Sequence, residues 1–133
     1  MSNSARHQDP VAAGYSERAA RLSVLIEGRT EIPSHHGTTR ERAERKHEPR
    51  VYYVISEFGG LIKIGRTVDF STRFYRMHHN NSCRNPILLA WEPGDYDLES
   101  YRHHQLEASN HRGEWFYVTD ELIDHIESVR ESM

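Results

Sequence analysis

The chain has 133 residues, of which 36% are hydrophobic and 28% charged, and its formal net charge is −3 with histidine neutral. This length suits one domain with an additional segment, and the net charge weighs against a protein that holds DNA through bulk positive charge. No apolar run approaches the ~18 residues of a membrane span, so no membrane partner is expected. The single cysteine, Cys83, excludes an internal disulfide, and the absence of an apolar N-terminal run favours a cytoplasmic protein.

Residues 1–49 differ in composition from the rest of the chain. A helix is predicted over 16–27, where apolar residues recur at helical spacing between Ser16 as N-cap and Gly28 as the terminating residue. The stretch that follows mixes proline, glycine, histidine and charge and contains few apolar residues. We therefore expect a flexible N-terminal tail over 1–49 that carries this helix, and a compact domain over 50–133.

The compact domain is predicted to begin with a β-hairpin. The stretch "VYYVISEF" is β-branched and aromatic, as strands are, "FGG" is typical of a turn, and "LIKIGRT" forms the returning strand. A helix through His79 follows, capped by Asp69 or Ser71. Its apolar stripe is formed by Phe70, Phe74 and Met77.

Four more elements are predicted after residue 85. "PILLAWE" is a third strand, a helix spans about 97–109, "GEWFYVT" is a short extended segment, and Thr119 caps a final amphipathic helix. The order β-β-α-β-α-β-α predicts an α+β fold. In this fold a small central antiparallel sheet of about three strands is flanked by helices.

Positive charge is concentrated around the predicted hairpin. Lys63 lies in the middle of an apolar strand, and Arg66 lies at its end. From Lys63 to Arg84 there are five Lys or Arg residues and one acidic residue, Asp69. This pattern fits a local basic face on an acidic molecule, and it fits a solvated helix face equally well.

Several stretches together resemble the GIY-YIG nuclease domain, in the phage and bacterial branch that carries KIG in place of YIG. They are "VYYVI", "KIGRT", "STRF", "ESYRHHQL" and "RGEWF", and they cover roughly residues 50–130. Arg73 matches the arginine of the family's first helix, His103 the histidine of a later helix, and Glu114 the glutamate that binds the metal. Lys63 stands at the second tyrosine of the family motif.

The first tyrosine of the motif is matched by Tyr53 or by its neighbour Tyr52. Tyr53 is favoured because "YVI" is the pattern of this branch. The two side chains of adjacent strand residues point to opposite faces of a sheet, so only one of them fits the role. Met77 stands where the family often has a histidine, and no residue matches the family's late asparagine.

The resemblance implies a GIY-YIG-like fold and a metal-dependent DNA endonuclease or nickase that hydrolyses phosphodiester bonds. Glu114 would hold Mg²⁺ or Mn²⁺ together with water and phosphate. Arg73 would present its planar fork to the nonbridging oxygens, and His103 would relay a proton or contact the phosphate. Arg66 and Arg76 would extend the nucleic-acid-binding surface.

A tyrosine base needs a lowered pKa, because a free phenol has a pKa of about 10. We expect Lys63 to face Tyr53 across the hairpin and to favour its phenolate. If Tyr52 is the base instead, the strand register differs by one residue.

Simpler interpretations exist for each candidate. Lys63 suits an edge strand, Arg73 an ion pair with Asp69, His103 a helix surface, Glu114 a cap, and the tyrosines a core. Adjacent histidines on a helix do not converge on one ion, so zinc is not expected. Two other functions remain open. One is a catalytically weak or inactive GIY-YIG-like nucleic-acid-binding domain, and the other is a phage accessory protein that acts through protein–protein contacts, with residues 1–49 as its docking element.

Overall fold

A computed structural model of the chain describes residues 10–31 and 48–133, with side chains described from residue 17 onward in the first range. Its strands form one five-stranded sheet in the order β3-β1-β2-β5-β4, and every pairing is antiparallel. The strands are β1 (Arg50–Ser56), β2 (Ile62–Thr67), β3 (Pro86–Pro93), β4 (Asn110–Arg112) and β5 (Trp115–Phe116). The predicted α+β fold is confirmed. The sheet has two more strands than expected, because residues 110–116 form a short hairpin.

Helices follow the caps that the sequence predicts. Helix α4 (Phe70–His79) begins after Asp69, which accepts a hydrogen bond from the Thr72 amide at 3.2 Å. Helix α6 (Asp120–Glu131) begins after Thr119, whose hydroxyl accepts from the Leu122 amide at 3.1 Å. The helix predicted over 97–109 is divided into α5 (Tyr96–Gln105) and a 3-10 turn, η1 (Glu107–Ser109).

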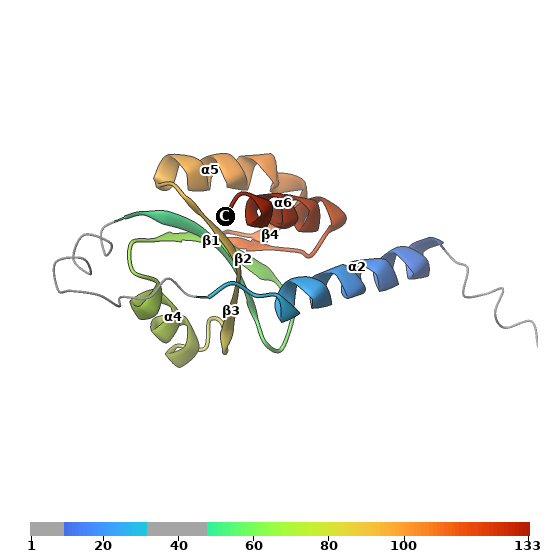
Figure 1. Cartoon of the computed structure of the whole chain (residues 1–133), viewed down its shortest axis with the longest axis horizontal. Coiled ribbons are helices and arrows are strands. Elements are labelled where there is room, and N and C mark those ends of the chain that lie inside the picture. Colours follow the sequence, from blue (N-terminus) through green and yellow to red (C-terminus); the bar gives the residue numbers. More distant parts are fainter. Residues whose placement is uncertain (1–9, 32–47) are drawn as a thin grey trace, which may run out of the picture.

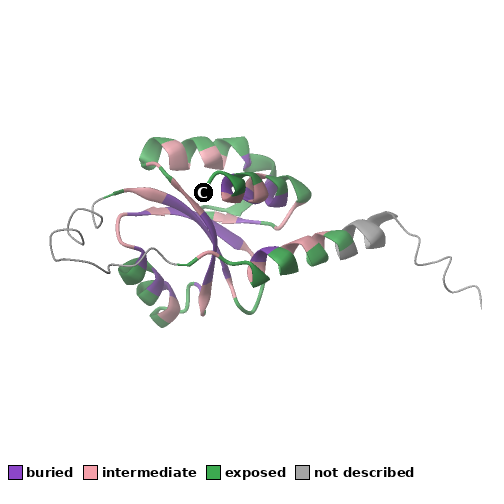
Figure 2. Ribbon diagram, in the orientation of Figure 1, coloured by how far each residue is buried: buried purple, intermediate pink, exposed green. Residues whose placement is uncertain are grey.

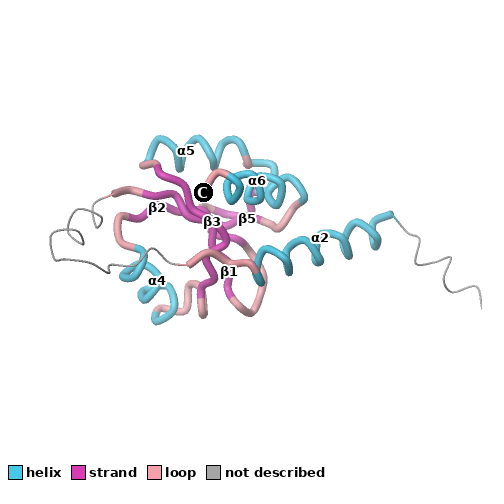
Figure 3. Tube along the Cα trace, in the orientation of Figure 1, coloured by secondary structure: helices cyan, strands magenta, loops and turns pink. Residues whose placement is uncertain are grey.

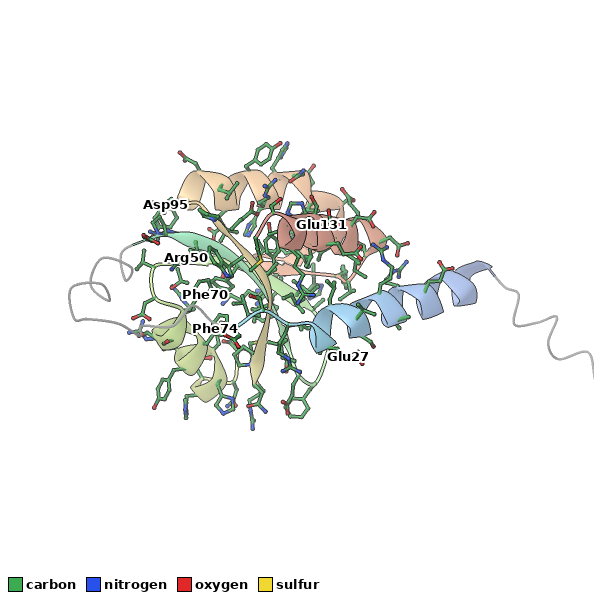
Figure 4. The ribbon with its side chains drawn as sticks, viewed as in Figure 1. Glu27, Arg50, Phe70, Phe74, Asp95 and Glu131 are labelled. Atoms are coloured by element: carbon green, nitrogen blue, oxygen red, sulfur yellow. The ribbon has the colours of Figure 1, made fainter. Side chains whose placement is uncertain are left out.

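The sheet separates two apolar layers, which Figures 1 and 3 show as helices on its two sides. Helix α4, which carries Phe70 and Phe74, covers one face (Figure 4). There both rings pack against Tyr52. Helices α5 and α6 cover the other face, where Tyr53 belongs to the larger core cluster. Strands β1 and β2, between these helices, are buried along nearly their whole length (Figure 2). Alternation of period two along β1 therefore sends its two tyrosines into different cores.

The register of the β1–β2 hairpin decides which residues share a face. Lys63 pairs with Val54, Gly65 with Tyr52, and Ile64 with Tyr53. Directly paired residues lie on the same face, so Lys63 shares its face with Tyr52 and not with Tyr53. The prediction that Lys63 faces Tyr53 is therefore wrong by one residue.

Helix α2 (Pro10–Glu27) packs against α6 and β3. Leu25 is only 3% exposed and belongs to the core cluster of α6, while Arg21 forms ion pairs with Asp124 at 2.5 Å and with Glu127.

The helix is longer than the one predicted over 16–27, and it shares its core with the domain predicted over 50–133. The remaining parts of the predicted tail, residues 1–9 and 32–47, lie outside the described residues. Within the described ranges, no helix is both long and apolar enough to cross a membrane.

The buried position of Leu25 makes α2 a contributor to stability. We expect Leu25→Ala to lower the free energy of unfolding by about 2–5 kcal/mol, the usual cost of truncating a buried leucine. The neighbouring Val24, which is 66% exposed, is a matched control, and Val24→Ala is expected to change stability by less than about 0.5 kcal/mol. Urea unfolding followed by circular dichroism measures both, and equal midpoints for the two variants would show that α2 does not pack on the core.

Candidate active site at the open edge of strand β2

Strand β2 is only partly covered by its short neighbour β5. In β2 only Ile62 and Lys63 pair with β5. On this side of the strand, the backbone N–H and C=O of Ile64 form hydrogen bonds outside the β2–β5 pairing. Its amide donates to the Glu114 carbonyl at 2.9 Å, and its carbonyl oxygen lies 2.8 Å from His103 Nε2. Since a carbonyl only accepts, His103 Nε2 carries the hydrogen, and Nδ1 of the neutral ring is left as an acceptor. The beginning of β5 and helix α5 thus meet at this edge.

Lys63 is held beside the carboxylate of Glu114. Its Nζ lies 3.6 Å from Glu114 Oε2 and 5.7 Å from the centre of the Trp115 ring. The lysine side chain is 11% exposed, whereas that of Glu114 is 46% exposed and reaches solvent. Lys63 is paired on both sides, to β1 and to β5, so an edge-strand role does not account for it.

Tyr52 lies directly over Gly65. A Cβ atom at residue 65 would be 2.5 Å from the Tyr52 hydroxyl oxygen and 2.6 Å from Cζ, which is closer than real Cβ contacts allow. The glycine of the "KIG" stretch is therefore needed to admit the tyrosine ring. Phe70 and Phe74 make edge-type contacts with the same ring at centroid distances of 6.1 and 5.8 Å.

The phenol of Tyr52 is buried, and several charged residues act on its pKa. Burial raises the pKa of Tyr52 above its ordinary value, the positive charge of Arg73 acts in the lowering direction, and Glu114 and Glu99 act in the raising direction. The net shift is upward, opposite to the expected lowering. These four residues, from β1, α4, α5 and the start of β5, thus share one electrostatic neighbourhood next to Lys63.

Glu99 is a site residue that the sequence reasoning did not select. It is half-buried on α5, and its pKa is raised by burial and by the nearby charge of Glu114, while His103 and two arginines oppose the rise. The available signal was its position four residues before His103 in "ESYRHH", which puts both side chains on one helix face.

The remaining basic candidates lie around this cluster. Arg73 and Arg76 are exposed on α4, three residues apart and therefore on one side of the helix. Arg66 is engaged elsewhere, since its guanidinium pairs with Asp95 at the start of α5 and lies 4.0 Å from the Tyr96 ring centre.

Tyr53 belongs to a different polar cluster on the opposite face of the sheet. Its hydroxyl donates to Glu92 Oε2 at 2.5 Å and lies 2.7 Å from His125 Nε2. Arg102 donates to both oxygens of Glu92 at 2.8 and 2.9 Å. Burial, followed by the hydrogen bond to Glu92, raises the pKa of Tyr53. This arrangement fixes Tyr53 as a neutral donor in a structural network.

The carboxylates of the site suit a hard divalent cation. Glu99 and Glu114 are close enough for the charge of one to raise the pKa of the other, a repulsion that a cation would relieve. Within the described part of the chain, no three His, Cys, Asp or Glu side chains converge as a metal-binding group. Such a small donor set fits Mg²⁺ or Mn²⁺, which retain water ligands and bind through one or two carboxylates.

Comparisons with protein-family models, with curated proteins and with solved structures gave no significant match to this chain. The function is therefore argued from the geometry and charges of the site.

The Tyr53–Glu92–Arg102 network makes a testable contribution to stability. Burial acts to raise the pKa of Glu92, but hydrogen bonds from Arg102 and Tyr53 hold it below its ordinary value. A carboxyl with a depressed pKa stabilises the fold above its unfolded pKa of about 4.3, and this contribution is lost as the pH falls through the folded pKa. We expect Glu92→Gln to cost about 1.5–3 kcal/mol at pH 7, with the difference from wild type shrinking below about pH 4.

Glu107→Gln provides the control, because the Glu107 side chain is 72% exposed in a surface pair with His104. Urea unfolding from pH 3 upward measures both variants at about one-unit intervals. A stability difference for Glu92→Gln that stays constant across this range would contradict the assignment.

Proposed function

We propose that the chain is a metal-dependent nuclease that hydrolyses phosphodiester bonds in DNA, with its active site at the open edge of β2. The observation that carries the proposal is the 3.6 Å contact between buried Lys63 and the half-exposed carboxylate of Glu114. The charges of Glu114, Glu99 and Arg73 also act on the buried phenol of Tyr52. Phosphodiester hydrolysis needs these groups, since a water must be oriented and the charge on phosphorus balanced. The resemblance of the same stretches to GIY-YIG nucleases supports the proposal.

Glu114 is the residue proposed to hold the divalent cation, with Glu99 as its neighbour. The Glu114 side chain is 46% exposed and therefore accessible to both the ion and the DNA phosphate. A Mg²⁺ or Mn²⁺ ion bound there would polarise the phosphoryl oxygen and stabilise the leaving oxygen. In the proposal, Lys63 orients Glu114 while remaining buried against Trp115.

Arg73 is proposed to bind the nonbridging oxygens of the scissile phosphate. It is exposed on α4, and its positive charge acts to lower the pKa of both Tyr52 and Glu99. A guanidinium contributes a planar fork that matches two phosphate oxygens. Arg76, on the same side of α4, is proposed to contact the DNA backbone next to it.

Tyr52 replaces Tyr53 as the proposed residue that orients the attacking water and receives its proton. Because burial raises the pKa of Tyr52, its phenolate requires positive charge nearby, which Arg73 supplies. The Nδ1 atom of His103 is a second acceptor at this edge, and it is proposed to carry the proton onward.

A second candidate function, nucleic-acid binding without cleavage, is favoured by one specific contact. The ammonium of Lys63 already lies 3.6 Å from Glu114 and partly neutralises the carboxylate on which metal binding would depend. In this case the basic side chains of α4 bind phosphates, and the carboxylates are structural.

Nicking of supercoiled plasmid DNA in Mg²⁺ or Mn²⁺ tests the proposal. We expect the wild type to nick the plasmid, and Glu114→Gln and Tyr52→Phe to be slower by about 100-fold or more, the usual loss when a group that transfers protons or stabilises charge is removed. Tyr53→Phe is the matched control, because it removes the same hydroxyl from the neighbouring residue on the opposite face. It is expected to retain nicking while losing stability.

Circular dichroism establishes that each variant is folded at the assay temperature. Binding of plasmid by the wild type with no nicking in either metal would favour the second candidate function. A folded Tyr53→Phe protein without activity, beside an active Tyr52→Phe protein, would place the active site on the face covered by α6.

A further inference from the structure

A groove next to the candidate active site combines exposed aromatic and cationic side chains. It is formed by the turn after β1, the loop after α4 and the β4–β5 hairpin. We call it the Phe58 groove, and the side chains that give it its character are Phe58, Arg84, His111, Arg112 and Trp115. Phe58 is 71% exposed at the tip of the β1–β2 hairpin, an unusual position for so large an apolar ring.

Trp115 connects the groove to the proposed active site. Trp115 lines the groove, and the Lys63 ammonium lies 5.7 Å from the centre of the Trp115 ring. The same ammonium contacts Glu114. A strand lying in the groove would therefore contact Trp115, the residue that follows the proposed metal-binding Glu114.

The charge of the groove is opposite to that of the whole chain. The chain has 20 acidic and 17 basic residues, yet none of the described residues that line the groove is Asp or Glu. Arg84 donates to the neutral Asn81 at 3.2 Å, and among the described residues neither Arg84 nor Arg112 is ion-paired with a carboxylate. Both guanidinium charges thus remain available to an anionic partner.

We propose that the Phe58 groove binds unpaired nucleotides of a nucleic-acid strand, so that the preferred substrate has a single-stranded segment beside the scissile phosphate. Bases within a duplex are already stacked on each other, and only an unpaired base offers its face to an aromatic side chain. Phe58 and Trp115 supply such surfaces, and Arg84 and Arg112 neutralise the phosphates between the bases. This inference rests on the proposed function, because it names the class of substrate for that same site.

Equilibrium binding without cleavage tests the groove separately from the nuclease activity. The probe is a fluorescein-labelled oligothymidine of about ten nucleotides, a length within the usual site size for such surfaces. It is compared with a duplex of the same length by fluorescence anisotropy, in EDTA so that no metal-dependent cleavage occurs. We expect the wild type to bind the single strand more tightly than the duplex.

Phe58→Ala is expected to weaken binding of the oligothymidine by about fivefold or more, the loss of one base–aromatic stack. Phe58→Leu should weaken it similarly, since leucine keeps apolar bulk without a π face. Tyr101→Ala is the matched control, because Tyr101 is a 58% exposed aromatic residue on α5 outside the groove, and it should leave binding unchanged. Arg112→Gln should make the negative slope of log affinity against log salt shallower by about 0.7, the contribution of one phosphate contact on a single strand.

Unchanged binding in Phe58→Ala, an equal loss in Tyr101→Ala, or tighter binding of the duplex would overturn the inference. If plasmid is nicked while oligothymidine binding does not depend on Phe58, the proposal for the Phe58 groove is wrong and the nuclease proposal is retained. If binding depends on Phe58 and no plasmid is nicked, the nuclease proposal is wrong and single-strand binding by the groove is retained.

Discussion

The close contact between Tyr52 and Gly65 across strands β1 and β2 fixes the candidate site. The absence of a Cβ at residue 65 lets the tyrosine ring lie over the neighbouring strand, with its hydroxyl 2.5 Å from where that Cβ would be. The same register puts Lys63 on the Tyr52 face and sends Tyr53 to the other side. The rest of the candidate site is formed beside the part of β2 that does not pair with short β5. Helix α5 contributes Glu99 and His103, and helix α4 contributes Arg73.

Adjacent tyrosines on β1 receive different chemical environments because a strand alternates its faces. Tyr53 donates to Glu92, which Arg102 holds with two hydrogen bonds, so its proton is firmly placed and its role is to join β1, β3, α5 and α6. Tyr52 has no such carboxylate partner among the hydrogen bonds of the described residues. Burial is the main cause of the raised pKa of Tyr52, and the charges of Arg73, Glu114 and Glu99 act on it with opposite signs.

Local features of the sequence were sufficient for most of the fold. The strand composition of "VYYVISEF" and the caps at Asp69 and Thr119 predicted β1, α4 and α6 because these signals act within a few residues. The hairpin register was not predictable in the same way. It depends on how many residues the turn uses, and the turn contains Gly59 and Gly60 with positive φ angles of 84° and 99°. The packing of Leu25 on the core and the interaction of Glu99 with Glu114 join segments that are distant in sequence. Hydrophobic periodicity describes single elements, so it could not predict these contacts.

The most direct test of this account is the distance of each β1 tyrosine from a bound Mn²⁺ ion, measured by paramagnetic broadening of ring signals in protein with ¹³C-labelled tyrosine. Tyr52→Phe and Tyr53→Phe identify the two signals among the seven tyrosines. The account predicts that substoichiometric Mn²⁺ broadens the Tyr52 signal more strongly than the Tyr53 signal, and that Glu114→Gln abolishes the difference. Stronger broadening of Tyr53, or a Tyr52 effect that persists in Glu114→Gln, would contradict it.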